Sequence, residues 1–64
     1  MKISVYSPSH RQWEEQVEVK STRAAHRYAR RIARVWGVSA VHVYYLLKDG
    51  THRGRDADDV ISLD

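Results

Sequence analysis

Residues 22–37 predict one amphipathic helix, and this helix constrains what the rest of the chain can fold into. At about 100° of rotation per residue, apolar side chains gather within one arc and arginines within the opposite arc. The apolar arc holds Ala25, Tyr28, Ala29, Ile32 and Trp36. The opposite arc holds Arg23, Arg27, Arg30, Arg31 and Arg34, and no acidic residue interrupts either arc. Such a helix needs an apolar surface beneath it and leaves a cationic surface on its other side.

Residues with capping chemistry mark both ends of this helix. Ser21 or Thr22 is expected to be the N-cap, since its side-chain oxygen can accept a hydrogen bond from a backbone N–H two or three residues on. Gly37 is expected just after the helix, because glycine readily enters the left-handed conformation that ends a helix. The side chains expected to contact a sheet are Ala25, Tyr28, Ala29, Ile32, Ala33, Val35 and Trp36.

Two segments before the helix alternate between apolar and polar residues. In residues 2–6 the alternation, counted with Met1, places Met1, Ile3 and Val5 on one side. Residues 13–20 place Trp13, Val17 and Val19 on their apolar side, and Glu15 breaks that pattern. A period of two is typical of strands, and Pro8 with its flanking serines favours a turn between them. The two segments therefore predict an antiparallel hairpin with one dry face.

Residues 40–47 are the most β-prone run, and both of their faces are largely apolar. We therefore expect a strand that is central in the sheet or covered. Asp49 and Gly50 favour a two-residue type I′ hairpin loop, because that turn needs positive φ at both positions. The implied fourth strand would pair Leu46 with Arg53 and Tyr44 with Arg55.

The last apolar segment has two possible structures. Val60–Leu63 would form a short last strand, or a helical turn capped by Asp58 or Asp59.

The order of elements predicts one α+β domain over residues 1–64. We expect a two-layer ββαββ architecture, with one amphipathic helix packed across one face of a mostly antiparallel sheet of three or four strands. This order resembles that of ubiquitin-like β-grasp domains, whose last strand runs parallel beside the first. The resemblance rests on element order and implies no function. A simple antiparallel sheet under one helix is the competing topology.

Composition narrows the class of protein. The chain has 64 residues and no cysteine, which excludes a disulfide framework and a thiolate zinc site. No apolar run approaches a membrane span, and residues 1–6 lack the apolar middle of a signal peptide. A domain this small has little room for both a core and a deep catalytic cleft. We therefore expect a soluble cytoplasmic binding module, and the excess of arginine over lysine hints at a bacterial or phage origin.

The five helix arginines carry the main functional prediction. Like charges three and four residues apart cost stability, so an anionic partner is expected to relieve them. Arginine suits bidentate binding of phosphate or carboxylate. The predicted partner is a polyanion, with nucleic acid favoured, and Arg53 and Arg55 are expected to add to the same charge. One alternative is an acidic protein surface, which could include this chain's own Asp56, Asp58 and Asp59. The other is that arginine is only a good helix former on a wet face.

A second candidate surface lies on the predicted sheet. Tyr6, His42, Tyr44 and Leu46 are expected to share its outer face and to form an uncovered apolar patch. Such a patch marks a protein partner or a homodimer. The alternative function is therefore a protein-interaction or inhibitory module.

Catalytic chemistry is not predicted. His10, His26, His42 and His52 lack metal-ligand spacing, and there is no glycine-rich phosphate loop. We therefore expect no metal, no cofactor and no enzymatic activity. One minor alternative is that His52 acts with Asp56 or Asp58 as the base of a small nuclease.

Overall fold

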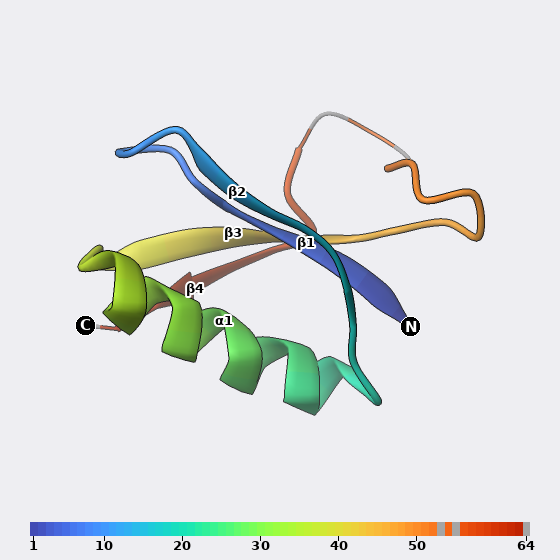
Figure 1. The fold of residues 1–64 in the computed structure, drawn as a ribbon, viewed down its shortest axis with the longest axis horizontal. Helices are drawn as coiled ribbons and strands as arrows, with labels where there is room; N and C mark the ends of the chain where they lie inside the picture. Colours follow the sequence, from blue (N-terminus) through green and yellow to red (C-terminus); the bar gives the residue numbers. More distant parts are fainter. Residues whose placement is uncertain (53, 55, 64) are drawn as a thin grey trace.

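The computed structural model describes residues 1–52, 54 and 56–63, and it places a single helix against one face of a four-stranded sheet (Figure 1). This is the predicted α+β class with a ββαββ order. The elements are β1 (Lys2–Ser7), β2 (Gln12–Glu18), α1 (Thr22–Trp36), β3 (Ala40–Tyr45) and β4 (Asp59–Ser62).

The strand order in the sheet is β2-β1-β3-β4, and every neighbouring pair is antiparallel. In the β-grasp order the last strand would run parallel beside β1. Here β3 pairs with β1, and β4 pairs with the outer side of β3. The competing prediction, a simple antiparallel sheet under one helix, is therefore the correct one.

Helix α1 begins and ends as its sequence predicts. The Ser21 Oγ accepts a hydrogen bond from the Ala24 amide at 3.1 Å, which makes Ser21 rather than Thr22 the N-cap. Gly37 adopts a φ of 70°, and the Val38 amide donates to the Ala33 carbonyl at 2.9 Å. Val38 is buried against the core, so the helix end is closed by both hydrogen bonding and apolar contact.

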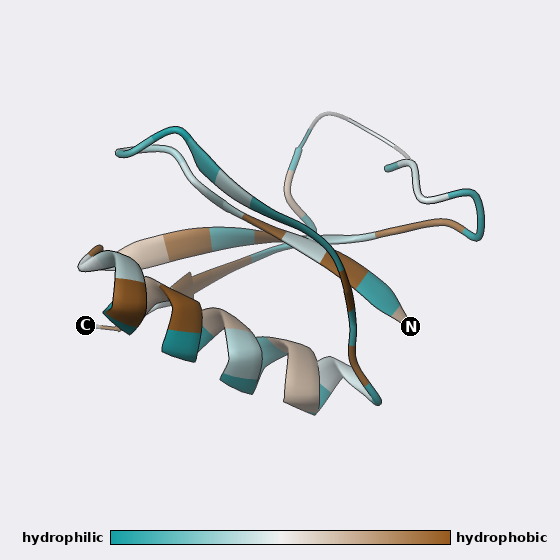
Figure 2. Ribbon diagram, in the orientation of Figure 1, coloured by the Kyte–Doolittle hydropathy of each residue, from teal (hydrophilic) through white to brown (hydrophobic). Residues whose placement is uncertain are grey.

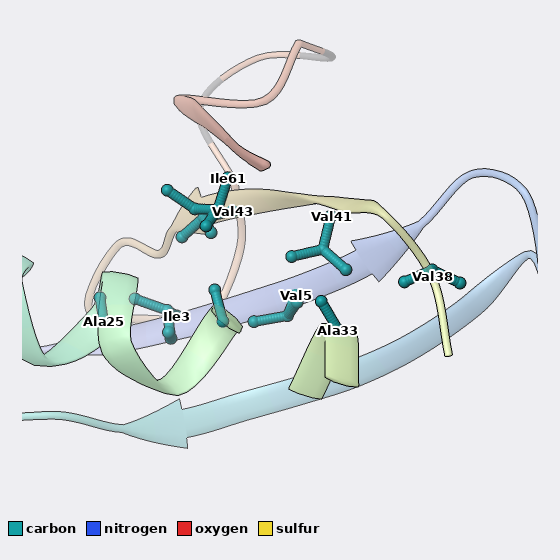
Figure 3. Packing of buried hydrophobic residues seen from close by; sticks show 9 residues of the cluster. Ile3, Val5, Ala25, Ala33, Val38, Val41, Val43 and Ile61 are labelled. Carbon is teal, nitrogen blue, oxygen red and sulfur yellow. The ribbon is translucent and has the colours of Figure 1, made fainter. Parts of the chain in front are cut away.

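The core lies between α1 and the face of the sheet that it covers (Figure 3). Ala25, Ala29 and Ala33 are fully buried, so small side chains bring the helix close to the strands. The other buried apolar residues are Ile3, Val5, Val38, Val41, Val43 and Ile61. Figure 2 shows hydrophilic and hydrophobic segments along α1, as its amphipathic pattern requires.

One predicted helix contact is wrong. Val35 is 74% exposed, whereas Ile32 and Trp36 pack against the core. Successive helix residues are about 100° apart, so Val35 is rotated past the edge of the face that Trp36 occupies.

The segment between β3 and β4 differs from the predicted two-residue hairpin. The Leu47 amide donates to the Thr51 carbonyl at 2.8 Å, and Leu46 forms a bridge with His52. The loop therefore contains residues 48–50, with Gly50 at a φ of 85°, which suits a three-residue loop ending in a left-handed glycine. The expected pairs of Leu46 with Arg53 and Tyr44 with Arg55 involve residues 53 and 55, which lie outside the described residues.

The last strand of the sheet comes from the C-terminal segment. β4 (Asp59–Ser62) pairs Ile61 with Val41 and Val60 with His42. The strand alternative for Val60–Leu63 is therefore correct, because the buried Ile61 side chain completes the apolar layer under α1.

Among the described residues, no helix has the length and the apolar composition that a membrane span requires.

Candidate functional site

The arginine face of α1, formed by the five predicted arginines, points away from the sheet. All five side chains are exposed. Among residues 1–52, 54 and 56–63, none of them lies within ion-pair distance of a carboxylate. These positions are Arg23, Arg27, Arg30, Arg31 and Arg34. The face is therefore an uncompensated cationic surface about 16 Å long, counting 1.5 Å per helix residue.

A shallow hollow of about 460 Å³ runs along one flank of this face, where α1 approaches the end of β2. Arg27, Arg31 and Arg34 line it together with Lys20. One acidic residue also lines it, Glu18. The N-terminal ammonium group lies 2.7 Å from the Glu18 carboxylate and holds its pKa below the usual value. The hollow therefore keeps a strong excess of positive charge.

Tyr28 forms an aromatic wall in the same hollow. Its pKa is raised, first by partial burial and then by the negative charge of Glu14, while Arg31 acts in the opposite direction. The Tyr28 hydroxyl, which is protonated at neutral pH as in any ordinary tyrosine, can donate a hydrogen bond to an anion held by the arginines.

The outer sheet face, on the side away from α1, brings the second set of predicted residues together. In the register of β1 and β3, Tyr6 lies opposite His42 and Ser4 lies opposite Tyr44. The Tyr6 and His42 rings meet at a centroid distance of 6.4 Å. Leu46 continues the same row along the chain just beyond β3, since side chains two residues apart share one face of a strand.

Trp13 also belongs to this face, although its alternation with Val17 predicts the opposite side. Its ring lies 4.4 Å from that of Tyr6 and 5.3 Å from that of Tyr44, measured between centroids. The prediction for Trp13 is therefore wrong, and it missed the largest aromatic residue of the surface.

A β-bulge explains this error. Between the pairs Ile3–Val17 and Val5–Glu14, β1 has one residue and β2 has two. The extra residue is accommodated at Gln16, which has a φ of 53° and whose amide donates to the Ser4 Oγ at 3.3 Å. A one-residue shift turns the preceding part of the strand over. The signal in the sequence was Glu15, which broke the alternation.

His52 completes the aromatic cluster from the loop after β3. Its ring meets Tyr44 edge-on at a centroid distance of 4.6 Å. The Nε2 atom lies 3.1 Å from a carboxylate oxygen of Asp58, and the Nδ1 atom contacts the Gly54 carbonyl. Both ring nitrogens of His52 therefore face hydrogen-bond acceptors.

A concave pocket opens among these rings, and we refer to it as the ring pocket. Its volume is about 290 Å³. The residues that line it are Ser4, Trp13, Tyr44, Leu46, Gly50, His52 and Gly54. No local pattern predicted this pocket, because it forms only when the bulge exposes Trp13 and the loop returns His52 over Tyr44.

A third cluster joins the helix to the sheet and was also missed by sequence reasoning. The Tyr45 hydroxyl donates to an Asp59 carboxylate oxygen at 2.5 Å, and His26 Nε2 lies 2.8 Å from the same oxygen. These bonds hold the pKa of Asp59 below its usual value, with Tyr45 contributing most. Partial burial and the bond to Asp59 raise the pKa of Tyr45 to about 12. The cluster ties β4 to α1.

Two further observations bear on possible chemistry. Over the residues that the structure describes, no three His, Asp or Glu side chains converge as metal ligands would. Asp58 and Asp59 bond to His52, Tyr45 and His26 rather than to the helix arginines.

Comparison with models of known protein families finds no match, and searches of curated proteins and of solved structures find none either.

Proposed function

We propose that this protein is a small, non-enzymatic binding module whose arginine face docks on a polyanion, and that the polyanion is nucleic acid. One observation carries the proposal. Five guanidinium groups are exposed on one helix face, and in the described parts of the chain no carboxylate pairs with any of them. Like-charged neighbours at these spacings cost a few tenths of a kcal/mol per pair. A row of phosphates would remove that cost.

The shape and chemistry of the face support a phosphate partner. The arginines follow one line along α1, so successive guanidinium groups can meet successive phosphates of one strand. The flanking hollow adds Lys20 and the Tyr28 hydroxyl to Arg27 and Arg31. Guanidinium groups bind phosphate through two parallel hydrogen bonds, which fixes orientation as well as charge.

Internal neutralisation is one competing explanation for an arginine-rich face, and the contacts disfavour it. Asp58 and Asp59 already have partners on the sheet side, and Glu18 pairs with the N-terminus. These carboxylates are therefore occupied elsewhere and do not quench the helix charge.

The test is the salt dependence of binding to a labelled DNA duplex and to a labelled single strand, followed by fluorescence anisotropy. Replacing Arg27, Arg31 and Arg34 with glutamine should lower the slope of log K against log salt by about 0.9 for each duplex phosphate that is no longer neutralised. Arg27→Lys is the matched control. It keeps the charge and hence the slope, and it weakens binding only because the bidentate geometry is gone.

Two results would contradict the proposal. One is a slope that the glutamine substitutions leave unchanged. The other is a partner from lysate that survives nuclease treatment and is released by Leu46→Asp but not by the arginine substitutions. That second result would favour a protein-interaction module on the outer sheet face.

A further inference from the structure

The ring pocket lies on the side of the sheet opposite α1, so it is separate from the arginine face. The segment after β3 rises on this side of the sheet (Figure 1), and the ring contact between His52 and Tyr44 fixes that segment over the outer face. The result is an open, shallow site with aromatic walls. Its volume of about 290 Å³ suits one small planar ring system.

Trp13 and Tyr44, which line this pocket, and Gln16, which packs on the lining residue Gly50, carry polar atoms without partners among the described residues. In the described part of the chain the Trp13 Nε1, the Tyr44 hydroxyl and the side-chain amide of Gln16 make no hydrogen bond. The Gln16 amide packs on Gly50, where an added Cβ would lie 3.0 Å from the Gln16 Nε2. The pocket rim therefore offers two donors, one hydroxyl and one amide carbonyl to the edge of a bound ring.

Positive charge lies next to the pocket. A second hollow of about 240 Å³ shares Leu46 with the ring pocket, and Lys2 and Lys48 line it. Among residues 1–52, 54 and 56–63 neither lysine forms an ion pair. Glu18 also lines this hollow, but the N-terminal ammonium compensates its charge. An aromatic pocket thus adjoins a cationic one, which matches a base joined to a phosphate.

We propose that the ring pocket binds one unpaired base of a single-stranded nucleic acid, with the neighbouring phosphate at Lys2 and Lys48. Any base can stack on Trp13 or Tyr44, because every base has a π face, and its edge can bond with the Gln16 amide. A duplex does not offer a splayed base and should not enter. The inference goes beyond the arginine face, which needs only phosphates.

A second copy of the chain fits this surface less well. Two sheets pack face to face at about 10 Å, with side chains interdigitating across flat faces. Here the loop carrying His52 stands over the outer face and blocks such an approach near Tyr44.

The experiment uses Trp13 as its own reporter. Trp36→Phe removes the other tryptophan, which packs against the core under α1, and leaves Trp13 as the sole source of indole emission. The protein is titrated with an oligothymidylate of about eight nucleotides, with an abasic strand of the same length, with thymidine monophosphate and with a duplex. We expect quenching by the oligothymidylate and none by the abasic strand or the duplex.

Variants locate the effect. Tyr44→Ala should weaken binding of the oligothymidylate by roughly 5- to 150-fold, the range for removing one stacked base. Tyr44→Phe keeps the ring and should stay close to the parent. Replacing both Lys2 and Lys48 with glutamine should lower the salt slope by about 0.7 for each single-strand phosphate that is no longer neutralised. Val60→Ala, on the outer face but away from the pocket, is the matched control and should change nothing.

Several outcomes would overturn the inference. Equal quenching of Trp13 by the abasic strand would show that the pocket does not recognise a base, and equal affinity for thymidine monophosphate would assign the pocket to a free nucleotide. Trp13 emission that depends on protein concentration alone would assign the face to a second copy. The arginine substitutions at 27, 31 and 34 should leave base-dependent quenching in place. The ring pocket and the arginine face can therefore fail separately.

Discussion

The arginine face and the outer sheet face are both exposed, but they affect stability in opposite directions. On α1, like charges such as Arg27 and Arg31 repel one another, and the described carboxylates do not approach them. On the sheet, Trp13 and Tyr44 contact each other and bury apolar area. The arginine face lowers the stability of the isolated protein, and the outer sheet face raises it. A binding surface can therefore destabilise its own fold until its partner arrives.

The largest expected effect comes from Gln16→Pro, because proline cannot adopt the φ of 53° on which the bulge in β2 depends. Without the bulge, the four-residue spacing of Trp13 and Val17 puts both on one face, so Trp13 would turn toward the layer filled by α1 and Glu14 would turn outward. The free energy of unfolding should fall by about 3 kcal/mol, because the core would be overpacked and the outer rings would separate. Urea denaturation followed by circular dichroism measures it.

Gln16→Asn is the control for that substitution. Asparagine tolerates positive φ, so the bulge survives and stability should stay within about 0.5 kcal/mol of the parent. A Gln16→Pro variant as stable as the parent would show that the bulge does not decide which face Trp13 occupies.

Trp13→Ala should be the next largest change. The side chain is 47% exposed but contacts the rings of Tyr6 and Tyr44. We expect the free energy of unfolding to fall by about 2 kcal/mol, below the range for a fully buried tryptophan. Thermal unfolding of this variant is compared with that of Val60→Ala, an exposed residue on the same face. Similar small decreases in both would mean that the ring contacts contribute nothing.

Asp59→Asn tests the link between the helix layer and β4. At pH 7 the free energy of unfolding should fall by about 1 kcal/mol, below the range of about 1.5 to 3 kcal/mol for a hydrogen bond to a charged group, because Asp59 is partly exposed. The pKa of Asp59 is lowered in the folded state, first by the bond from Tyr45. Its contribution is therefore present above the unfolded value of about 3.9 and is lost as pH falls through the lower folded pKa.

Urea midpoints at pH 7 and near pH 3 measure this dependence. Asp56→Asn is the control, since Asp56 is exposed and makes no hydrogen bond or ion pair with the described residues. Tyr45 makes stability depend on pH at the alkaline end, because its pKa is raised to about 12 in the folded state. Its contribution is present below about pH 10 and is lost as pH rises between 10 and 12. An Asp59→Asn variant with the parent's full acid dependence would argue against the cluster.

The smallest effect has the opposite sign. Arg27→Gln removes like-charge neighbours from Arg23, Arg30 and Arg31, so stability should rise by about 0.3 kcal/mol at low salt. In 1 M salt this increase should disappear, because the Debye length is then about 3 Å. Arg27→Lys, which keeps the charge, should show no increase. A destabilised Arg27→Gln would mean that the arginine is held by contacts within the protein.

Local signals explain what the sequence could predict. The helix period, the Ser21 cap and the Gly37 end all act within a few residues, so the bounds of α1 and its arginine face followed directly. The apolar alternation of β1 and β3 likewise placed Tyr6, His42 and Tyr44 on one face.

The remaining features depend on pairing between distant segments. One extra residue in β2 moved Trp13 to the other face, and one extra residue in the loop at 48–50 changed the partner of Leu46 to His52. The bonds of Asp59 to His26 and Tyr45 join three elements that no periodicity connects. The ring pocket needs Trp13 and His52, which only these pairings bring next to Tyr44, so the sequence alone did not predict it.

The sheet order makes β2 and β4 the two edge strands, and neither is suited to pairing with a further strand. β4 is four residues long, and β2 is interrupted by its bulge and carries acidic side chains such as Glu15 and Glu18. Edge strands that are short, bent or charged do not offer a neighbouring chain a continuous set of backbone hydrogen-bonding groups. The molecule should therefore stay free of fibrils when concentrated, even though aromatic side chains cover much of its open side.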